Sequence, residues 1–248
     1  MLFGKGIAYA EYFICRTYPA TRAYARRPRP PIAPEPQIVD AMDDPHLPFH
    51  PPLVAILRGV TPDAVVAHVE ALLEAGVNAI EIPTGSPDWA RSVALAVAAC
   101  GERALAGAGT VLETAHLDAL QAAGGRLVVT PNVRPALIRE ARARGFTIAA
   151  GVATASEAFD ALEAGAQMLK LFPAAVYGPA LPRALRSVLP PVPLLAVGGI
   201  TVDNLGDYLA AGCSGAAVGG ELYRPGQAPA RTLANAQRFV AAWQAHSR

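Results

Sequence analysis

Lysine is almost absent from this sequence of 248 residues, although 21 of its side chains are Lys or Arg. Lys5 and Lys170 are lysines, and every other basic side chain is an arginine. The net charge is +1, so no excess of positive charge indicates a nucleic-acid partner. Because arginine supplies the other positive charges, the presence of Lys170 within an apolar segment calls for a specific explanation.

Cysteine, histidine and long apolar runs are scarce as well. Cys15, Cys100 and Cys213 are odd in number and far apart, which argues against a disulfide framework or a zinc knuckle and favours the reducing cytoplasm. None of the five histidines lies at the end of a predicted strand, so we expect no metal site. Glycine and proline interrupt the apolar runs, and we expect no contact with a membrane.

The first 50 residues differ from the rest of the chain. They contain the stretch RRPRPP and many further prolines, and they show neither helical nor strand periodicity. We therefore expect a disordered, Pro/Arg-rich extension over residues 1–50, followed by a single domain over residues 51–248. A transit peptide is one alternative, and a start placed too far upstream, with Met42 as the true start, is another.

A repeated pattern begins at Leu53. Each unit has a helical stretch, a glycine and a short apolar run, as in LLEAG-VNAIEIP and ARARG-FTIAAG. A glycine directly after a helix is typical of a left-handed helix end, and the apolar run that follows is typical of a buried parallel strand. Together with Leu53–Leu57 and Pro193–Val197, the pattern gives eight strands. The repeat-ending glycines are Gly76, Gly101, Gly124, Gly145, Gly165 and Gly212.

Eight units of similar length predict an α/β fold, a single (β/α)8 TIM barrel. Thr61-Pro62 and Ser86-Pro87 each place a capping residue before a proline, and we expect both pairs to begin helices. The alternative is a doubly wound sheet of eight strands. The even spacing and the lack of a GxGxxG motif after the first strand favour the barrel.

Two charged residues interrupt predicted strands. Lys170 lies in MLKLF and Glu81 in AIEIP. Side chains alternate along a strand, so both can face the barrel interior. Burial, helped by a cation such as Arg58, would favour the neutral amine of Lys170, which suits a Schiff-base lysine, and Glu81 could act as general base and acid. The structural alternative is an ion pair between Lys170 and Glu81.

Further candidates follow the strands, where barrels place their active sites. Arg58 could hold a substrate carboxylate with its planar guanidinium, or it could be an ordinary exposed arginine. Thr110 could contact substrate or could cap the next helix. Two glycine pairs end the seventh and eighth strands, where barrels commonly bind phosphate through backbone N–H groups. These pairs are Gly198-Gly199 and Gly219-Gly220.

The motifs VAILRG, EIPTGSP, GAGTVL, VTPN, LKLFP, AVGGI and GGELYRPGQ occur in order over residues 50–245. In this order they resemble the KDPG/KHG aldolase family. The resemblance implies a metal-free class I aldolase that forms an imine at Lys170 and uses Glu81 as acid and base. It also implies substrate contacts from Arg58, Thr110, Gly198, Gly219 and Gly220, and a homotrimer.

The expected substrate is a phosphorylated 2-keto-3-deoxy sugar acid. Val197 and Gly85 differ from the threonine and arginine of gluconate-type relatives and favour 2-dehydro-3-deoxy-6-phosphogalactonate, cleaved to pyruvate and D-glyceraldehyde 3-phosphate. The alternatives are the gluconate epimer and 4-hydroxy-2-oxoglutarate. A non-catalytic barrel that binds a phosphorylated sugar is a more remote alternative, because it would have no use for Lys170 and Glu81.

Overall fold

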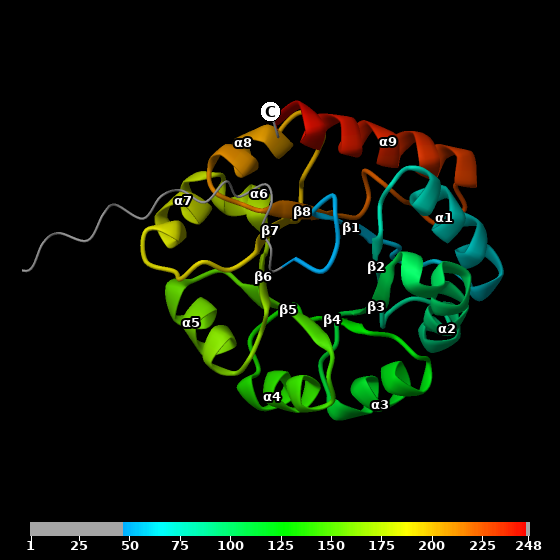
Figure 1. The fold of residues 1–248 in the computed structure, drawn as a ribbon, viewed down its shortest axis with the longest axis horizontal. Coiled ribbons are helices and arrows are strands. Elements are labelled where there is room, and N and C mark those ends of the chain that lie inside the picture. Colours follow the sequence, from blue (N-terminus) through cyan, green and yellow to red (C-terminus); the bar gives the residue numbers. More distant parts are fainter. Residues whose placement is uncertain (1–46, 247–248) are drawn as a thin grey trace, which may run out of the picture. The chain divides into compact units, whose positions relative to one another are not determined.

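The computed structural model describes residues 47–246, which form a closed barrel of eight parallel strands (Figure 1). The strands pair in chain order, and β8 pairs with β1 to close the sheet. The predicted barrel is therefore confirmed, and the open doubly wound sheet is excluded. The strands are β1 Leu53–Ile56, β2 Ala79–Pro83, β3 Leu105–Gly109, β4 Leu127–Val129, β5 Thr147–Val152, β6 Met168–Leu171, β7 Leu194–Val197 and β8 Gly215–Val218.

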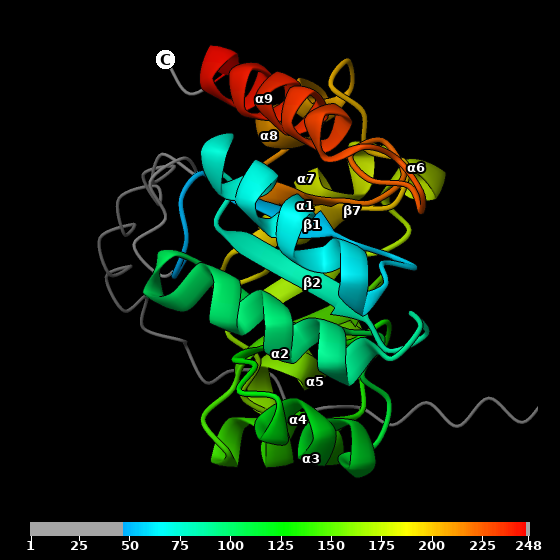
Figure 2. The ribbon, with the colours of Figure 1, turned by 90° about the vertical axis from the view of Figure 1, so that its right-hand side faces the viewer.

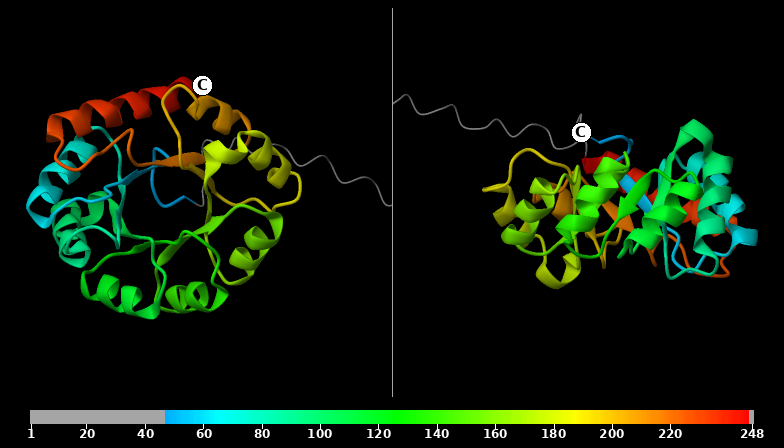
Figure 3. Two further views of the ribbon diagram at one scale, coloured as in Figure 1. Left: turned by 180° about the vertical axis from the view of Figure 1, so that it is seen from behind. Right: turned by 90° about the horizontal axis from the view of Figure 1, so that it is seen from below.

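Helices cover the outside of the barrel, as the side view in Figure 2 and the further views in Figure 3 show. Two short helices share the connection between β6 and β7, whereas the other connections carry one α-helix each. The helices are α1 Pro62–Glu74, α2 Trp89–Cys100, the 3-10 turn η1 Gly101–Arg103, α3 Thr114–Ala122, α4 Pro135–Ala143, α5 Ala155–Glu163, α6 Ala174–Tyr177, α7 Ala180–Arg186, α8 Leu205–Ala210 and α9 Pro229–His246. No helix in this part of the chain is both long and apolar enough to cross a bilayer.

The helix boundaries confirm most of the predicted signals. All six glycines predicted at helix ends have positive φ angles. Helix α1 begins at Pro62 after Thr61, as predicted, although the Thr61 side chain makes no capping hydrogen bond. The prediction for Ser86-Pro87 was wrong, because α2 begins at Trp89. The Ser86 hydroxyl instead accepts a hydrogen bond from the Gly59 amide at 2.9 Å and joins two loops.

The apolar side chains form two layers. One cluster fills the space between the helices and the strands, and a smaller cluster fills the barrel interior. The interior cluster includes Phe49 and the partly buried Leu47, which come from the segment before β1. Leu47 and Phe49, predicted as part of the extension, thus pack against the interior of the barrel. The predicted extension over residues 1–46 lies outside the described residues.

Candidate active site

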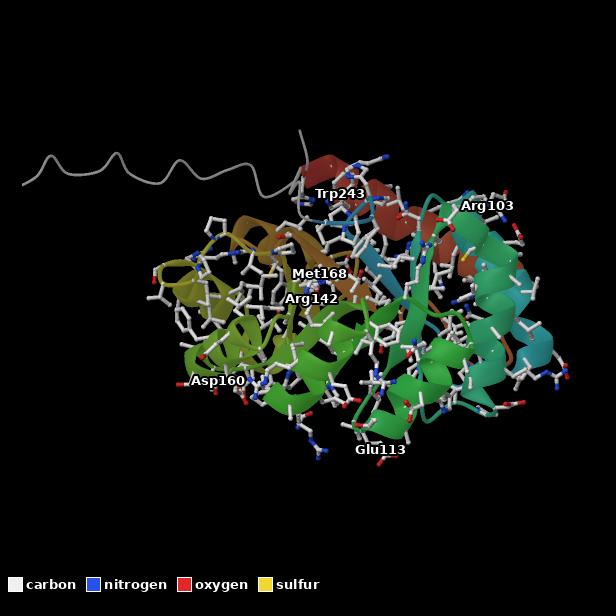
Figure 4. The ribbon with its side chains drawn as sticks, turned by 60° about the horizontal axis from the view of Figure 1, so that its bottom comes forward. Arg103, Glu113, Arg142, Asp160, Met168 and Trp243 are labelled. Carbon is white, nitrogen blue, oxygen red and sulfur yellow. The ribbon has the colours of Figure 1, made fainter. Side chains whose placement is uncertain are left out.

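The barrel interior contains a lysine and a glutamate among apolar side chains. Met168, Lys170 and Glu81 point into the barrel interior, and Figure 4 labels Met168 among the side chains. Lys170 and Glu81 line the same small cavity, whose walls are otherwise apolar. The remaining lining residues are Val54, Leu127, Val129, Ala149, Leu195, Val197 and Ala217.

Lys170 lies on β6 between Gly151 of β5 and Leu195 of β7. Only 6% of the residue is exposed. Its Nζ atom lies 5.3 Å from the centre of the Phe172 ring, and no carboxylate within residues 47–246 comes within 4.0 Å of it. The ion pair with Glu81, the structural alternative, is therefore not formed. A lysine amine that opens onto a cavity and is not held in an ion pair is placed to act as a nucleophile.

Glu81 lies on β2 and is completely buried. Within the described part of the chain, neither of its carboxyl oxygens has a hydrogen-bond partner. Burial raises the pKa of Glu81 above the usual range of a carboxyl group, and the positive charges of Lys170 and Arg58 oppose this effect only in part. A carboxyl group with a raised pKa is suited to act as both acid and base.

The position of the Glu81 carboxyl group depends on Gly109, a residue that the sequence reasoning did not assign to the site. A Cβ atom at position 109 would collide with Oε1 and Cδ of Glu81. The signal in the sequence was the GAG stretch of β3, next to the glutamate strand. Only the register of β2 and β3, which pairs Pro83 with Gly109, shows why glycine is needed there.

Replacing Gly109 by alanine should therefore displace the Glu81 carboxyl group. Because the atoms that must move belong to the end of a flexible side chain, we expect little change in the thermal midpoint. We expect kcat to fall on the order of 100-fold, as a displacement of about 1 Å in a catalytic group can cause. Steady-state kinetics and thermal denaturation measure the two effects. An unchanged kcat would show that the glutamate tolerates the displacement.

Arg58 and Thr110 lie in the loops that follow β1 and β3. Arg58 is exposed, and it is close enough to Glu81 to lower the pKa of that carboxyl group. Thr110 does not cap α3, whose N-cap is Glu113, so the capping alternative was wrong. Thr110 has a φ of 58°, rare for a β-branched residue, and its carbonyl accepts a hydrogen bond from Thr84 Oγ1 at 2.9 Å. Strained backbone of this kind is common at functional sites.

The two glycine pairs end neighbouring strands, β7 and β8. Gly198 and Gly199 have φ angles of 94° and 76°. Among residues 47–246, the amides of Gly198, Gly199, Gly219 and Gly220 donate no backbone hydrogen bond. Free N–H groups at adjacent strand ends can together bind the oxygens of an anion such as phosphate.

The residues predicted from the sequence thus divide into two groups within one barrel. Lys170 and Glu81 share the interior cavity, and the glycine pairs, Arg58 and Thr110 lie in the loops after the strands. Within the described residues no group of three or more His, Cys, Asp or Glu side chains could hold a metal ion. A closed parallel barrel with ionisable side chains inside its strands is typical of the (β/α)8-barrel enzymes.

Comparisons with known proteins give the family. A family model described as KDPG and KHG aldolase matches residues 50–234. The chain is 50% identical over 194 residues to 2-dehydro-3-deoxy-6-phosphogalactonate aldolase of Escherichia coli K12, which covers 78% of this chain and 95% of that protein. It is 45% identical over 199 residues to a probable aldolase of the same name from Rhizobium meliloti 1021. This match covers 80% of this chain and 94% of that protein. The chain therefore belongs to the KDPG and KHG aldolase family.

Solved structures agree with this assignment. A structure described as native KDPGal has a TM-score of 0.77 and 50% identity, and the match covers 79% of this chain and 95% of that one. The 2-keto-3-deoxy-6-phosphogluconate aldolase of Zymomonas mobilis ATCC 29191 has a TM-score of 0.70 and 28% identity, covering 77% and 92%. The identity is thus higher to the proteins named for the galactonate compound than to this protein named for the gluconate compound.

Proposed function

We propose that this chain is a class I aldolase that cleaves 2-dehydro-3-deoxy-6-phosphogalactonate to pyruvate and D-glyceraldehyde 3-phosphate. The observation that carries the proposal is Lys170, a buried amine that shares a cavity with the buried carboxyl group of Glu81 and has no ion pair within residues 47–246. The names of the two curated relatives reported above support the choice of substrate. The remote alternative of a non-catalytic barrel would leave both buried groups without a role.

The reaction begins at Lys170. Its neutral amine attacks the C2 ketone of the substrate, and loss of water gives a protonated imine. This iminium accepts the electrons that become available when the C3–C4 bond breaks. It thus replaces the metal ion that stabilises an enolate in other aldolases, and the mechanism requires no metal. Arg58 binds the substrate carboxylate and Thr110 lies beside it. The glycine amides after β7 and β8 bind the phosphate, so both ends of the substrate are fixed.

Glu81 then acts on the C4 hydroxyl group. Its carboxylate removes the hydroxyl proton, directly or through a water molecule, and the C3–C4 bond breaks. The C4 carbonyl leaves as glyceraldehyde 3-phosphate, and the bonding electrons move into the imine to give an enamine of pyruvate. Glu81 returns a proton to C3, and water hydrolyses the imine, which releases pyruvate and restores Lys170.

Substrate preference is expected to depend on Val197. Its side chain faces the interior from β7 and lines the cavity with Lys170 and Glu81. The galactonate and gluconate substrates differ in the configuration at C4, and a hydroxyl facing valine finds no hydrogen-bond partner. An unmade hydrogen bond of this kind changes a rate by about 10- to 100-fold.

We therefore expect wild-type enzyme to prefer the galactonate substrate, and Val197→Thr to shift the ratio of kcat/KM values toward the gluconate epimer by about 10- to 100-fold. Coupled assays that detect pyruvate measure both substrates side by side. A wild-type preference for the gluconate substrate, or a ratio that Val197→Thr leaves unchanged, would refute the stereochemical argument while leaving the aldolase chemistry intact. If wild-type enzyme prefers the gluconate substrate, the gluconate and 4-hydroxy-2-oxoglutarate activities become the leading candidates.

We further propose that the enzyme acts in the cytoplasm as a homotrimer, without nucleic-acid or membrane partners. Exposed apolar side chains close together in the sequence support an interface between copies of the chain. Phe172, Val176 and Tyr177 are 41%, 76% and 47% exposed, and all three lie in or next to α6. Monomers rarely expose several large apolar side chains so close together.

A further inference from the structure

The proposed phosphate site consists of neutral backbone donors, whereas a phosphate monoester carries about 1.5 to 2 negative charges at neutral pH. The loop that supplies two of these donors, Gly219 and Gly220, also carries Arg224. Resting on the function proposed above, we propose that Arg224 binds the substrate phosphate together with the glycine amides. Arginine suits this role because its guanidinium can donate two parallel hydrogen bonds to phosphate oxygens.

The side chain of Arg224 folds back over the glycine pair. Its Nε atom donates to the carbonyl oxygen of Gly220 at 2.9 Å, which places the guanidinium next to the residue whose amide is free. A Cβ atom at Gly220 would meet nothing within 4 Å, so there is open space beside this backbone.

The guanidinium retains donors for a ligand. Its Nη2 atom lies 3.7 Å from Glu221 Oε1, and this side chain pair is 72% and 53% exposed. Exposed pairs of this length contribute little. Within the described residues, the Nε bond to Gly220 is the sole hydrogen bond of the Arg224 side chain, so the N–H groups of both Nη atoms can turn to an anion.

The backbone of Arg224 is anchored to the rest of the molecule through Gln227. The Arg224 amide donates to Gln227 Oε1 at 3.1 Å. Gln227 Nε2 donates to the Leu222 carbonyl at 3.0 Å and to Thr232 Oγ1 at 2.7 Å. Thr232 is completely buried on α9, and its hydroxyl lies 2.8 Å from Nδ1 of the buried His68 on α1. A loop held to two helices loses less conformational freedom when a ligand binds.

Arg58, the other arginine considered for the substrate, lies in the loop after β1 and not in the glycine loop after β8. A Cβ atom on Gly59 would lie 2.9 Å from Pro225 Cγ, so the loop after β1 adjoins the loop after β8. Arg58 lies in that first loop and acts electrostatically on Glu81, at the reacting end of the substrate. Arg224 is the arginine that belongs to the glycine loop itself, and we therefore assign the phosphate end to it.

The test compares three variants. Arg224→Gln removes the charge, and Arg224→Lys keeps the charge but lacks the planar guanidinium. Arg238→Gln is the matched control, because it removes one charge from an exposed position of α9. Kinetics are measured with the phosphorylated substrate, with its unphosphorylated counterpart, and with inorganic phosphate as competitive inhibitor.

For Arg224→Gln we expect about tenfold increases in the KM of the phosphorylated substrate and in the inhibition constant of phosphate, the loss typical of one charge-assisted hydrogen bond. Its kcat and its kinetics with the unphosphorylated compound should stay unchanged. Arg224→Lys should lose part of the effect, and Arg238→Gln should behave as wild type.

Two results would overturn the role of Arg224. A loss in Arg224→Gln that is as large with the unphosphorylated compound as with the phosphorylated one would mean that Arg224 orders the loop through its bond to the Gly220 carbonyl and does not bind phosphate. Equal behaviour of Arg224→Gln and Arg238→Gln would mean that Arg224 makes no contact with phosphate. If wild-type enzyme itself shows no preference for the phosphorylated compound, the proposed substrate fails first and the role of Arg224 fails with it.

Discussion

Replacing Lys170 by arginine is expected to abolish aldol cleavage, with kcat reduced on the order of 10⁴-fold or more, as for the loss of other covalent nucleophiles. Arginine keeps a positive charge and a long side chain, but it cannot form the imine. The site has no obvious substitute, because the nearest groups to Lys170 are apolar side chains and the carboxyl group of Glu81.

The matched control is Lys5→Arg, because Lys5 and Lys170 are the two lysines of the chain. Lys5 lies outside the described residues, and from the sequence we expect no effect on kcat. Thermal denaturation of both variants shows whether the protein still folds. Substantial activity in folded Lys170→Arg would mean that another group carries the reaction.

Replacing Glu81 by glutamine is expected to reduce kcat about 10²- to 10⁴-fold, the usual contribution of a general acid or base. The galactonate and gluconate substrates should lose activity to the same extent, because both need the same proton transfers. Since the carboxyl group is completely buried without a hydrogen-bond partner in the described structure, the neutral amide should at the same time raise the thermal midpoint.

Glu81 also predicts the pH dependence. Burial raises the pKa of its carboxyl group, and the base is lost as the pH falls through that raised value. The acid limb of the kcat profile should therefore lie at higher pH than an exposed glutamate would give, and Glu81→Gln should lose this limb. If the acid limb lies in the usual pH range of an exposed carboxyl group, or if it is unchanged in Glu81→Gln, the limb belongs to a group other than Glu81.

The barrel and its two interior charges could be predicted from the sequence because each has a strong local signal. A glycine after a helix and an apolar run after that glycine recur six times along the chain, and a charge inside an apolar run has few explanations. Lys170 and Glu81 therefore stand out without any knowledge of contacts.

Other features could not be predicted because they depend on which residues meet in space. Ser86-Pro87 looks like a helix start, yet the Ser86 hydroxyl bonds to the amide of Gly59, 27 positions away. Gly109 matters because of the register between two strands. The bond between His68 and Thr232 joins residues 164 positions apart. A local pattern of residue types contains no information about such pairs.

The central claim, covalent catalysis by Lys170, is tested most directly by trapping. The protein is treated with pyruvate and sodium borohydride, digested, and analysed by mass spectrometry. We predict one reduced pyruvyl adduct on the peptide that contains Lys170, and none in Lys170→Arg. An adduct on Lys5, or no adduct in a protein that cleaves the substrate, would contradict the mechanism.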